Sequence, residues 1–521
     1  MFFYVFTRDM GLKIVVIDFG GQYTHLIARR VRELGVYSEI VEPENLERIL
    51  EKKDVGGVIL SGGPRSVLDE SIATLDLIFS ASPPLPVLGV CYGHQLIAKR
   101  FGGVIEKGGG REYGRTKIKI IHRDAILDGL PDEFWAWMSN WDIVVKPPRD
   151  WVVTSISEKG TITSMTDNSR IYSTQFHPEV THTEHGLRIL ENFLRSVCHI
   201  DRWWNPGEQL SSIIENLKNT VREDERVICA VSGGVDSVTT AVILSKAIED
   251  RLYCIFIDTG LLRKNEKENV ENTLKKMGVK NLITIDASSR FLEKLKGVRD
   301  SEMKRKIIGE EFIKVFEEIA SSLPNVKWLA QGTIYPDVVE SGKTGRQTAL
   351  IKSHHNVGGL PEKTLLKILE PLRDFYKDEV RAIAQKLGIP RDIWTRHPFP
   401  GPGLAVRVIG EVNVEKLEIC REASAIVEEE LKNAGVYDCV WQAFAVVGDD
   451  RWVGVIGDKR VDGYTVTIRV VESIDGMTAD WYRIDYNILD KIARRIVNEI
   501  PKVTMVTYAV SSKPPSTIEP C

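Results

Sequence analysis

The sequence lacks the features that mark several protein classes. No run of about 18 apolar residues occurs in its 521 residues, so no transmembrane helix is predicted. Its seven cysteines include no Cys-x-x-Cys pair, which argues against a disulfide scaffold and favours a reducing, cytoplasmic setting. Neither sign of charge dominates, because 69 Lys and Arg face 73 Asp and Glu, for a formal net charge of −4. The basic surplus of a nucleic-acid-binding protein is therefore missing.

The composition is that of a large folded protein. Hydrophobic residues make up 43% and charged residues 27%, and at about 150 residues per domain the length predicts three to four domains. The apolar opening Met1–Phe6 is cut off by Arg8 and Asp9, too early for a signal peptide. We interpret residues 1–10 as an appendage, because a strand pattern begins after them.

Hydrophobic patterning predicts two successive α/β domains with mainly parallel sheets and a smaller C-terminal α+β domain. The first domain, 12–200, alternates short β-branched runs with amphipathic stretches. The second, 205–400, opens with strand 226–231, helix 236–247 and strand 252–258, a βαβ unit. In the third, 401–521, strands outnumber helices, with strands predicted at 440–448, 451–457, 464–473 and 503–510.

Cys91 is the first candidate catalytic residue. It lies in the frame Gly89-Val90-Cys91-Tyr92-Gly93, and glycines two before and two after a nucleophile permit the sharp strand-to-helix turn of a nucleophile elbow. The helix that begins there would stabilise a thiolate. Downstream, His177 offers a base and Glu179 a carboxylate to orient it. The alternatives are a buried structural cysteine, a turn histidine, and a metal cluster with His182 and His185.

The strings GVCYGHQ (89–95), SGGP (61–64) and QFHPE (175–179) resemble the class I glutamine amidotransferases. This resemblance implies that Cys91 attacks the side-chain amide of glutamine, with His177 as general acid and base and Glu179 as its orienting partner. It also implies that the amides around Gly62 and Tyr92 hold the oxyanion and that Gln95 belongs to the glutamine site. The product would be ammonia.

A glycine-containing turn after strand 226–231 is the second candidate site. It opens a helix, so backbone N–H groups and two hydroxyls converge on a space that suits a phosphate, although such a turn is often only a turn. Neither G-x-x-x-x-G-K-[ST] nor G-x-G-x-x-G is present. The turn has the sequence SGGVDS (232–237), which resembles the pyrophosphate loop of the ATP pyrophosphatases. The resemblance implies that ATP is bound by Ser232, Gly233, Gly234, Val235, Asp236 and Ser237. It also implies that Asp236 lies near a Mg²⁺ ion that accompanies the ATP.

Five further strings identify the acceptor by resemblance. LAQGTIYPDVVES (329–341), KSHHNVGGLP (352–361), EPLRDFYKDEVR (370–381), RHPFPGPGLAVR (396–407) and SKPPSTIE (512–519) resemble the glutamine-hydrolysing GMP synthase family, and the match runs from about Leu12 to Glu519. The resemblance implies a homodimeric ligase whose substrates are xanthosine monophosphate (XMP), ATP and glutamine. It implies that XMP is contacted by Arg305, Asp458, Arg469, Lys513 and Glu519. It also implies that Lys352 is a lid lysine that faces the phosphates.

Two positions depart from that family's pattern, which commonly has His-Gly after Met-Ser and a basic residue before the last strand. Here Asn140-Trp141 and Met505 stand there. The alternatives to a GMP synthase are an RNA-modifying enzyme that adenylates a tRNA base and a non-catalytic nucleotide sensor. The first would be expected to carry a basic tail, an RNA-binding module or a catalytic cysteine pair, and the second would not need a complete triad.

Overall fold

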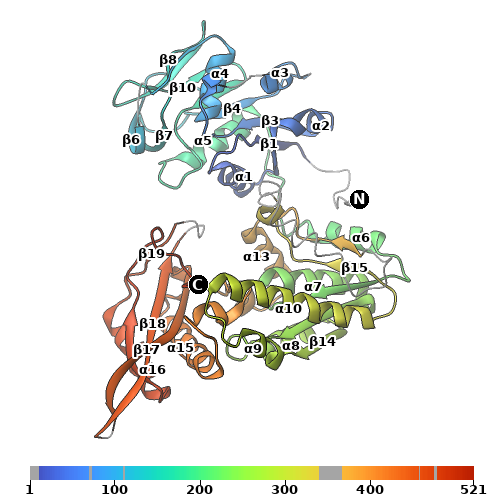
Figure 1. The fold of residues 1–521 in the computed structure, drawn as a ribbon. Coiled ribbons are helices and arrows are strands. Elements are labelled where there is room, and N and C mark those ends of the chain that lie inside the picture. Colours follow the sequence, from blue (N-terminus) through green and yellow to red (C-terminus); the bar gives the residue numbers. More distant parts are fainter. Residues whose placement is uncertain are drawn as a thin grey trace. The chain divides into compact units, whose positions relative to one another are not determined.

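The computed structural model describes residues 11–69, 73–81, 83–108, 112–338, 366–456, 458–473 and 478–521. The appendage 1–10 and Lys352 lie outside these residues. The chain forms two compact units that divide between Asn205 and Pro206 (Figure 1). Within the described residues, no helix combines the length and apolar character needed to cross a bilayer.

The first unit is built on a nine-stranded sheet. Strands β2, β1, β3, β4 and β11 pair in parallel, and the sheet continues through antiparallel strands. The parallel strands β1 and β3 are buried at every position, which explains their continuous apolar sequence. In sheet order the strands are β2 (Ser38–Val41), β1 (Lys13–Ile17), β3 (Val55–Leu60), β4 (Val87–Val90), β11 (Ile171–Thr174), β10 (Ile162–Thr166), β9 (Val152–Ser157), β6 (Glu112–Ile120) and β7 (Glu133–Asn140).

Helices and a small two-stranded sheet complete the first unit. Helix α4 follows β4 directly and carries the turn with Cys91 at its start. The described elements are α1 (Thr24–Glu33), α2 (Leu46–Leu50), α3 (Ala73–Phe79), α4 (Tyr92–Arg100), α5 (Gly186–Asn192), β5 (Val104–Glu106) and β8 (Ile143–Lys146).

A five-stranded parallel sheet organises the start of the second unit. Its order is β14 (Asn281–Asp286), β13 (Leu252–Asp258), β12 (Arg226–Ala230), β15 (Val326–Ala330) and β16 (Lys367–Leu369). The chain steps one way from β12 to β14 and then returns to β15. Right-handed crossovers therefore put α7 (Val235–Ile248) and α8 (Glu266–Lys276) on one face, and α9 (Ser288–Leu295) and α10 (Ser301–Ser322) on the other.

The C-terminal part adds a mixed sheet packed by two helices. Strand β18 pairs with β17 and β19 antiparallel and with β20 in parallel. The elements of this part are α15 (Val414–Asn433), β17 (Gln442–Ile456), β18 (Lys459–Glu472), β19 (Asp480–Trp481), α16 (Tyr486–Glu499) and β20 (Val503–Tyr508). Three other helices of the second unit precede it in the chain: α6 (Leu210–Thr220), α13 (Lys377–Lys386) and α14 (Arg391–Trp394). The predicted α/β class with a C-terminal α+β region is confirmed.

Two details differ from the sequence prediction. The strands expected at 440–448 and 451–457 form one strand, β17, because Gly448-Asp449-Asp450 makes a bulge between Val447 and Arg451 and does not end the pairing. The second unit is also continuous across residue 401. One apolar core includes Ile228 and Ile255 of the parallel sheet together with Ala443 and Ile468 of the C-terminal sheet.

Candidate active sites

Cys91 occupies a strained turn between β4 and α4. Its φ of 54° and ψ of −101° are unusual for a residue with a side chain. The glycines on either side are required by close approach: a Cβ on Gly89 would lie 2.6 Å from the carbonyl oxygen of Gly93. The strain lifts the thiol away from the sheet, toward a cavity of about 580 Å³.

His177 and Glu179 face this thiol from the turn after β11. The Nδ1 atom of His177 lies 2.7 Å from Glu179 Oε1, and both side chains are buried. Burial lowers the pKa of His177, but the carboxylate of Glu179 and hydrogen-bond contact with the Cys91 sulfur more than offset it, so the pKa lies well above its ordinary value. The ring of Tyr23 meets the imidazole edge-on at 4.9 Å. The arrangement can hold an imidazolium beside a thiolate and deliver its proton to a leaving amine.

The remaining residues expected at this site line the same cavity. Gly62 lies between the two reactive groups, since a Cβ there would be 3.3 Å from His177 Cε1 and 3.8 Å from Cys91 Cβ. Tyr92 is the first residue of α4, where helix N–H groups have no partner within the helix. Gln95 is buried and donates from Nε2 to the carbonyl of Asp142 at 2.8 Å.

The segment Ser139–Asp142 forms another wall of the cavity. Asp142 accepts from Ser66 Oγ at 2.5 Å and from the backbone N–H of Gly108 at 3.1 Å, so it fixes two neighbouring loops. Trp141 is 47% exposed. The departure Asn140-Trp141 therefore lies at the cavity that Cys91 and His177 line.

The histidines weighed as metal ligands have other settings. The ring of His182 lies 5.2 Å from that of Trp137, and His185 precedes α5 in a left-handed conformation. In the described part of the chain, no three His, Cys, Asp or Glu side chains are grouped to hold a metal ion.

The residues Ser232–Ser237 form the turn that follows β12 and the first three residues of α7. Gly233 has a φ of 83°, a conformation that glycine adopts without steric cost. The hydroxyls of Ser232 and Ser237 lie 3.2 Å apart, and α7 begins at Val235. Free helix N–H groups and two hydroxyls therefore surround one space, which suits a phosphate anion.

Asp236 gives this turn a carboxylate that can meet a cation. Its Oδ2 accepts from Lys377 Nζ at 2.6 Å, while Oδ1 is buried without a hydrogen-bond partner among the described residues. Burial raises the pKa of nearby Asp337, and the charge of Asp236 raises it further. Two carboxylates beside a phosphate turn fit the oxygen preference of Mg²⁺.

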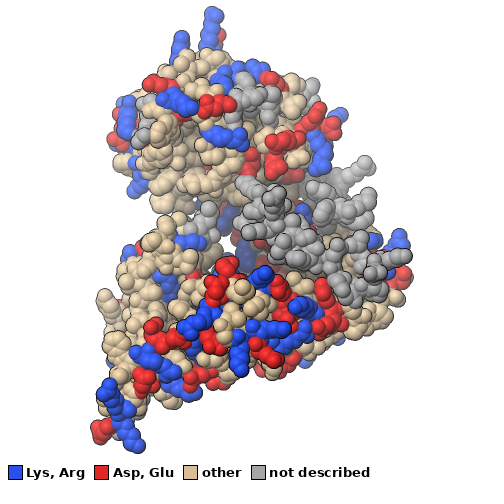
Figure 2. All heavy atoms as spheres, in the orientation of Figure 1, with Lys and Arg blue, Asp and Glu red and all other residues tan. Residues whose placement is uncertain are grey.

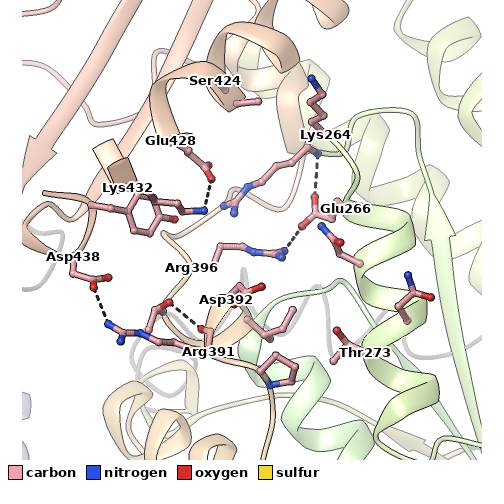
Figure 3. A pocket seen from close by; sticks show the side chains of 18 of the residues that line it. Lys264, Glu266, Thr273, Arg391, Asp392, Arg396, Ser424, Glu428, Lys432 and Asp438 are labelled. Atoms are coloured by element: carbon pink, nitrogen blue, oxygen red, sulfur yellow. Dashed lines mark hydrogen bonds and ion pairs between the residues drawn. The ribbon is translucent and has the colours of Figure 1, made fainter. Parts of the chain in front are cut away.

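A charged cleft of about 780 Å³ lies between α8, α14 and α15, next to this turn (Figure 3). Glu266 joins the two: its Oε1 accepts from Arg396 Nη1 at 3.0 Å and would lie 3.5 Å from a Cβ on Gly233. At the other end of the cleft Arg391 pairs with Asp438 at 2.9 Å (Figure 3). The ion pair of Glu266 and Arg396 therefore packs next to Gly233 of the turn 232–237.

Four of the five residues expected to contact XMP meet around the C-terminal tail. Arg469 is buried and donates to the carbonyls of Ser511 at 2.6 Å and Thr517 at 3.2 Å. Arg305 on α10 donates to the Cys521 carbonyl at 2.5 Å. Lys513 is fixed by a backbone bridge to Ala479. Glu519 pairs with Arg407 at 2.9 Å.

Asp458 is separate from these four within one chain. It lies in the turn between β17 and β18, eleven residues before Arg469, which is about 36 Å along a strand at about 3.3 Å per residue.

Comparison with known proteins matches both ends of the chain to families. Glutamine amidotransferase class-I matches residues 15–197, and GMP synthase C terminal domain matches residues 429–520. A glutamine-hydrolyzing GMP synthase of Pyrobaculum aerophilum is 55% identical over 510 residues, which cover 98% of this chain and 100% of that protein. The chain belongs to the glutamine-hydrolysing GMP synthase family. Relatives of the same name from Carboxydothermus hydrogenoformans and Aquifex aeolicus are each 51% identical, over 98% and 97% of this chain and 100% and 99% of their own lengths.

In this member of the GMP synthase family, the sequence motifs did not single out several residues that pair with, or lie close to, the expected site residues. The motif strings contain three such residues to which the motifs themselves assign no role. Lys377 and Asp337 lie beside the turn 232–237, and Arg407 lies beside Glu519. Lys377 begins α13, whose first turn also carries Asp378 and Glu379, so its local sequence does not distinguish it from a surface lysine. Nothing in the sequence pairs Arg407 with a residue 112 positions later.

Proposed function

We propose that this chain makes GMP from XMP, ATP and glutamine, with Cys91 releasing ammonia at one site and the turn 232–237 holding pyrophosphate at the other. The observation that carries the proposal is the buried set of Cys91, His177 and Glu179 in a chain that matches GMP synthases over 98% of its length. The activity is that of a ligase with glutamine as amido donor.

The first site hydrolyses glutamine. The Cys91 thiolate attacks the side-chain carbonyl, and the amides around Gly62 and Tyr92 receive the oxyanion. Imidazolium His177 gives its proton to the leaving nitrogen, so ammonia departs and a thioester remains. Water activated by neutral His177 then releases glutamate. Gln95 belongs to the wall that receives the substrate.

The second site primes XMP and aminates it. The O2 atom of xanthine attacks the α-phosphorus of ATP, and pyrophosphate leaves into the turn 232–237. Ammonia adds to C2 and AMP departs, so the products are GMP, AMP, pyrophosphate and glutamate. Asp236 would hold Mg²⁺ bound to the phosphates, and the ion would neutralise phosphate charge. Lys377 places a positive charge at the same turn.

The nucleotide XMP belongs beside the C-terminal tail in this proposal. Arg305, Arg469 and Lys513 supply positive charge for its 5′-phosphate, and Glu519 supplies a carboxylate for ring N–H groups. Lys352, which lies outside the described residues, is proposed as the lid lysine that faces the phosphates.

Product analysis tests this function. Incubation with XMP, Mg-ATP and glutamine is expected to yield AMP and pyrophosphate in equal amounts together with GMP. Inosine monophosphate, which lacks the C2 oxygen, is the control substrate and is expected to give neither AMP nor product. Formation of ADP, or equal turnover of inosine monophosphate, would contradict adenylation of that oxygen.

We also propose a homodimer, supported by the outer part of the β17–β18 hairpin. Between Arg451 and Tyr464, toward its tip, this hairpin pairs only with itself among the described strands. Trp452, Val453 and Val455 in this part are 54%, 48% and 73% exposed. An unpaired edge that exposes apolar side chains is a template for association with another chain. In a dimer the same hairpin would carry Asp458 to the nucleotide site of a second chain.

Mixing of variants tests the shared site. Asp458→Ala and Glu519→Gln chains are each expected to be weak in synthesis, and co-refolded mixtures to regain part of the activity through sites that contain neither change. The Val455→Lys chain is expected to be a monomer, as measured by light scattering. No recovery in the mixture would contradict a site built from two chains.

The rival function on RNA finds little support on the visible surface. Over α8, α9 and α10, Lys and Arg alternate with Asp and Glu, with no continuous basic field on that face (Figure 2). RNA binding needs such a field to meet the phosphate backbone. We propose a cytoplasmic location as well, because the seven cysteines are all free, which is typical of proteins in a reducing compartment.

A further inference from the structure

The carboxylate of Glu519 is held by a buried guanidinium. Arg407 is 1% exposed; its Nε donates to Glu519 Oε2 at 3.1 Å and its Nη2 to Oε1 at 2.9 Å. Gln442 donates from Nε2 to the same Oε1 at 2.6 Å. This two-pronged geometry belongs to arginine alone, since lysine has no planar fork.

Arg407 is itself held from several sides. Its guanidinium lies 4.9 Å from the ring centre of Phe399 and 4.2 Å from that of Phe444. The adjacent backbone is fixed because buried Lys304 donates from Nζ to the carbonyl of Val408 at 2.7 Å. The tail carboxylate therefore meets a donor whose own position is set by the core.

Counting acceptor sites shows which atom of Glu519 stays available. A carboxylate has about two lone pairs on each oxygen. Among the described residues, Oε1 takes donors from both Arg407 and Gln442, whereas Oε2 takes a donor only from Arg407. The Glu519 side chain is 16% exposed, so Oε2 keeps one lone pair for an outside donor. In XMP, the ring N–H groups flank the C2 oxygen that must be primed.

We propose that Arg407 is a positioning residue for XMP, because it fixes the direction in which Glu519 Oε2 presents that lone pair to a ring N–H. The assignment rests on the proposed contact between Glu519 and XMP. Arg407 itself does not touch the nucleotide. Losing the fork leaves the Glu519 carboxylate held at Oε1 by Gln442 alone, so the direction of Oε2 is no longer fixed, and XMP binding weakens while ATP binding does not.

Ammonium-dependent synthesis with varied XMP tests this, because it bypasses glutamine hydrolysis. Arg407→Lys and Glu519→Gln are each expected to raise KM for XMP about tenfold, with KM for ATP unchanged. If Arg407 acts through Glu519, the double variant is no worse than Glu519→Gln alone. A KM for XMP in the double variant about a hundredfold above that of the unaltered chain, and so about tenfold above that of Glu519→Gln, means independent roles and overturns the inference.

Two further variants separate the remaining outcomes. An unchanged KM for XMP in Glu519→Gln would refute the proposed nucleotide contact itself. If Arg407→Lys does not fold, Gln442→Leu removes the other donor to Oε1 and is expected to raise KM for XMP several-fold, whereas no change would count against positioning by these donors. Arg290→Lys is the matched control: Arg290 makes a two-pronged pair with Glu318 at 2.8 and 2.9 Å on the surface of α9 and α10, and its loss is expected to leave KM for XMP unchanged.

Discussion

Lys377 and Asp236 form an ion pair of 2.6 Å that joins the first turn of α13 to the first turn of α7. The pair is partly exposed, with side-chain exposures of 47% and 22%, so its own contribution to stability is below about 1 kcal/mol. Its importance lies in the charge that it places at the turn where pyrophosphate would bind.

Replacing Lys377 by glutamine is therefore expected to impair ATP use and leave folding intact. We expect KM for Mg-ATP to rise about tenfold, a loss typical of one charge-assisted hydrogen bond, with glutamine hydrolysis unchanged. Lys386→Gln, at the exposed end of the same helix, is the matched control. Equal KM values in both variants would mean that Lys377 does not face the nucleotide.

A Cys91→Ala chain is expected to lose glutamine-dependent synthesis and keep synthesis from added ammonium salt. The reason is that the thiol belongs only to the ammonia-releasing site, whereas the nucleotide residues lie in the other compact unit. Exposed Cys439→Ala is the control and should behave as the unaltered chain in both assays. Loss of both activities in Cys91→Ala would contradict two separate chemistries.

The pH profile of glutamine hydrolysis should depend on Glu179. Its carboxylate and the Cys91 sulfur hold the pKa of His177 well above the ordinary value, so the imidazolium persists through neutral pH and is lost as pH rises through that raised pKa. In Glu179→Gln burial is opposed by the sulfur alone, so the alkaline limb of kcat/KM moves to lower pH and kcat falls about a hundredfold. Glu184→Gln, an exposed neighbour paired with Arg115, should leave the limb in place.

Acid stability of the amidotransferase unit should depend on His94. This fully buried imidazole donates to or accepts from Ser173 Oγ at 2.8 Å, and burial lowers its pKa to about 3. The unfolded chain therefore binds this proton from about pH 6.5 downward while the folded chain does not, so stability falls as pH decreases from about 6.5 to 3.

The measurement is thermal unfolding at pH 7 and pH 5. In His94→Asn the loss of stability between these two values is expected to be smaller by on the order of 1–2 kcal/mol, even where the variant is less stable at pH 7. Exposed His199→Asn is the control and should keep the full loss. Identical pH dependence in all three chains would show that His94 does not titrate on unfolding.

Local patterns predicted the fold class and the two strand-to-helix turns that carry the candidate sites. The Gly-x-Cys-x-Gly frame and the glycine turn before α7 depend on a few consecutive residues, so their backbone shapes follow from sequence alone. The βαβ order followed from buried apolar runs. The break expected at Gly448 was wrong, because a bulge keeps the pairing of β17 intact where an isolated glycine pattern signals a turn.

Long-range relationships could not be predicted in the same way. The pairing of Arg407 with Glu519 depends on how the tail returns to the core, and the separation of Asp458 from Arg469 depends on the full extension of β18. Likewise, the setting of Asp337 has no local signature in the sequence. Its pKa is raised by burial and by the charge of Asp236, which lies about a hundred residues earlier in the chain. These effects arise from tertiary structure, which motif spacing does not encode.

The apolar core shared by the parallel sheet and the C-terminal sheet has a consequence for dissecting the molecule. A fragment ending at residue 400 would lose the side chains of Leu404, Ala405 and Val408 and all later members of the same core, so part of that core would face water. Heterologous expression of such a truncated piece is expected to give aggregates. Division between Asn205 and Pro206 is expected to give two pieces that remain folded, so glutamine hydrolysis and nucleotide synthesis are best reconstituted from fragments cut there.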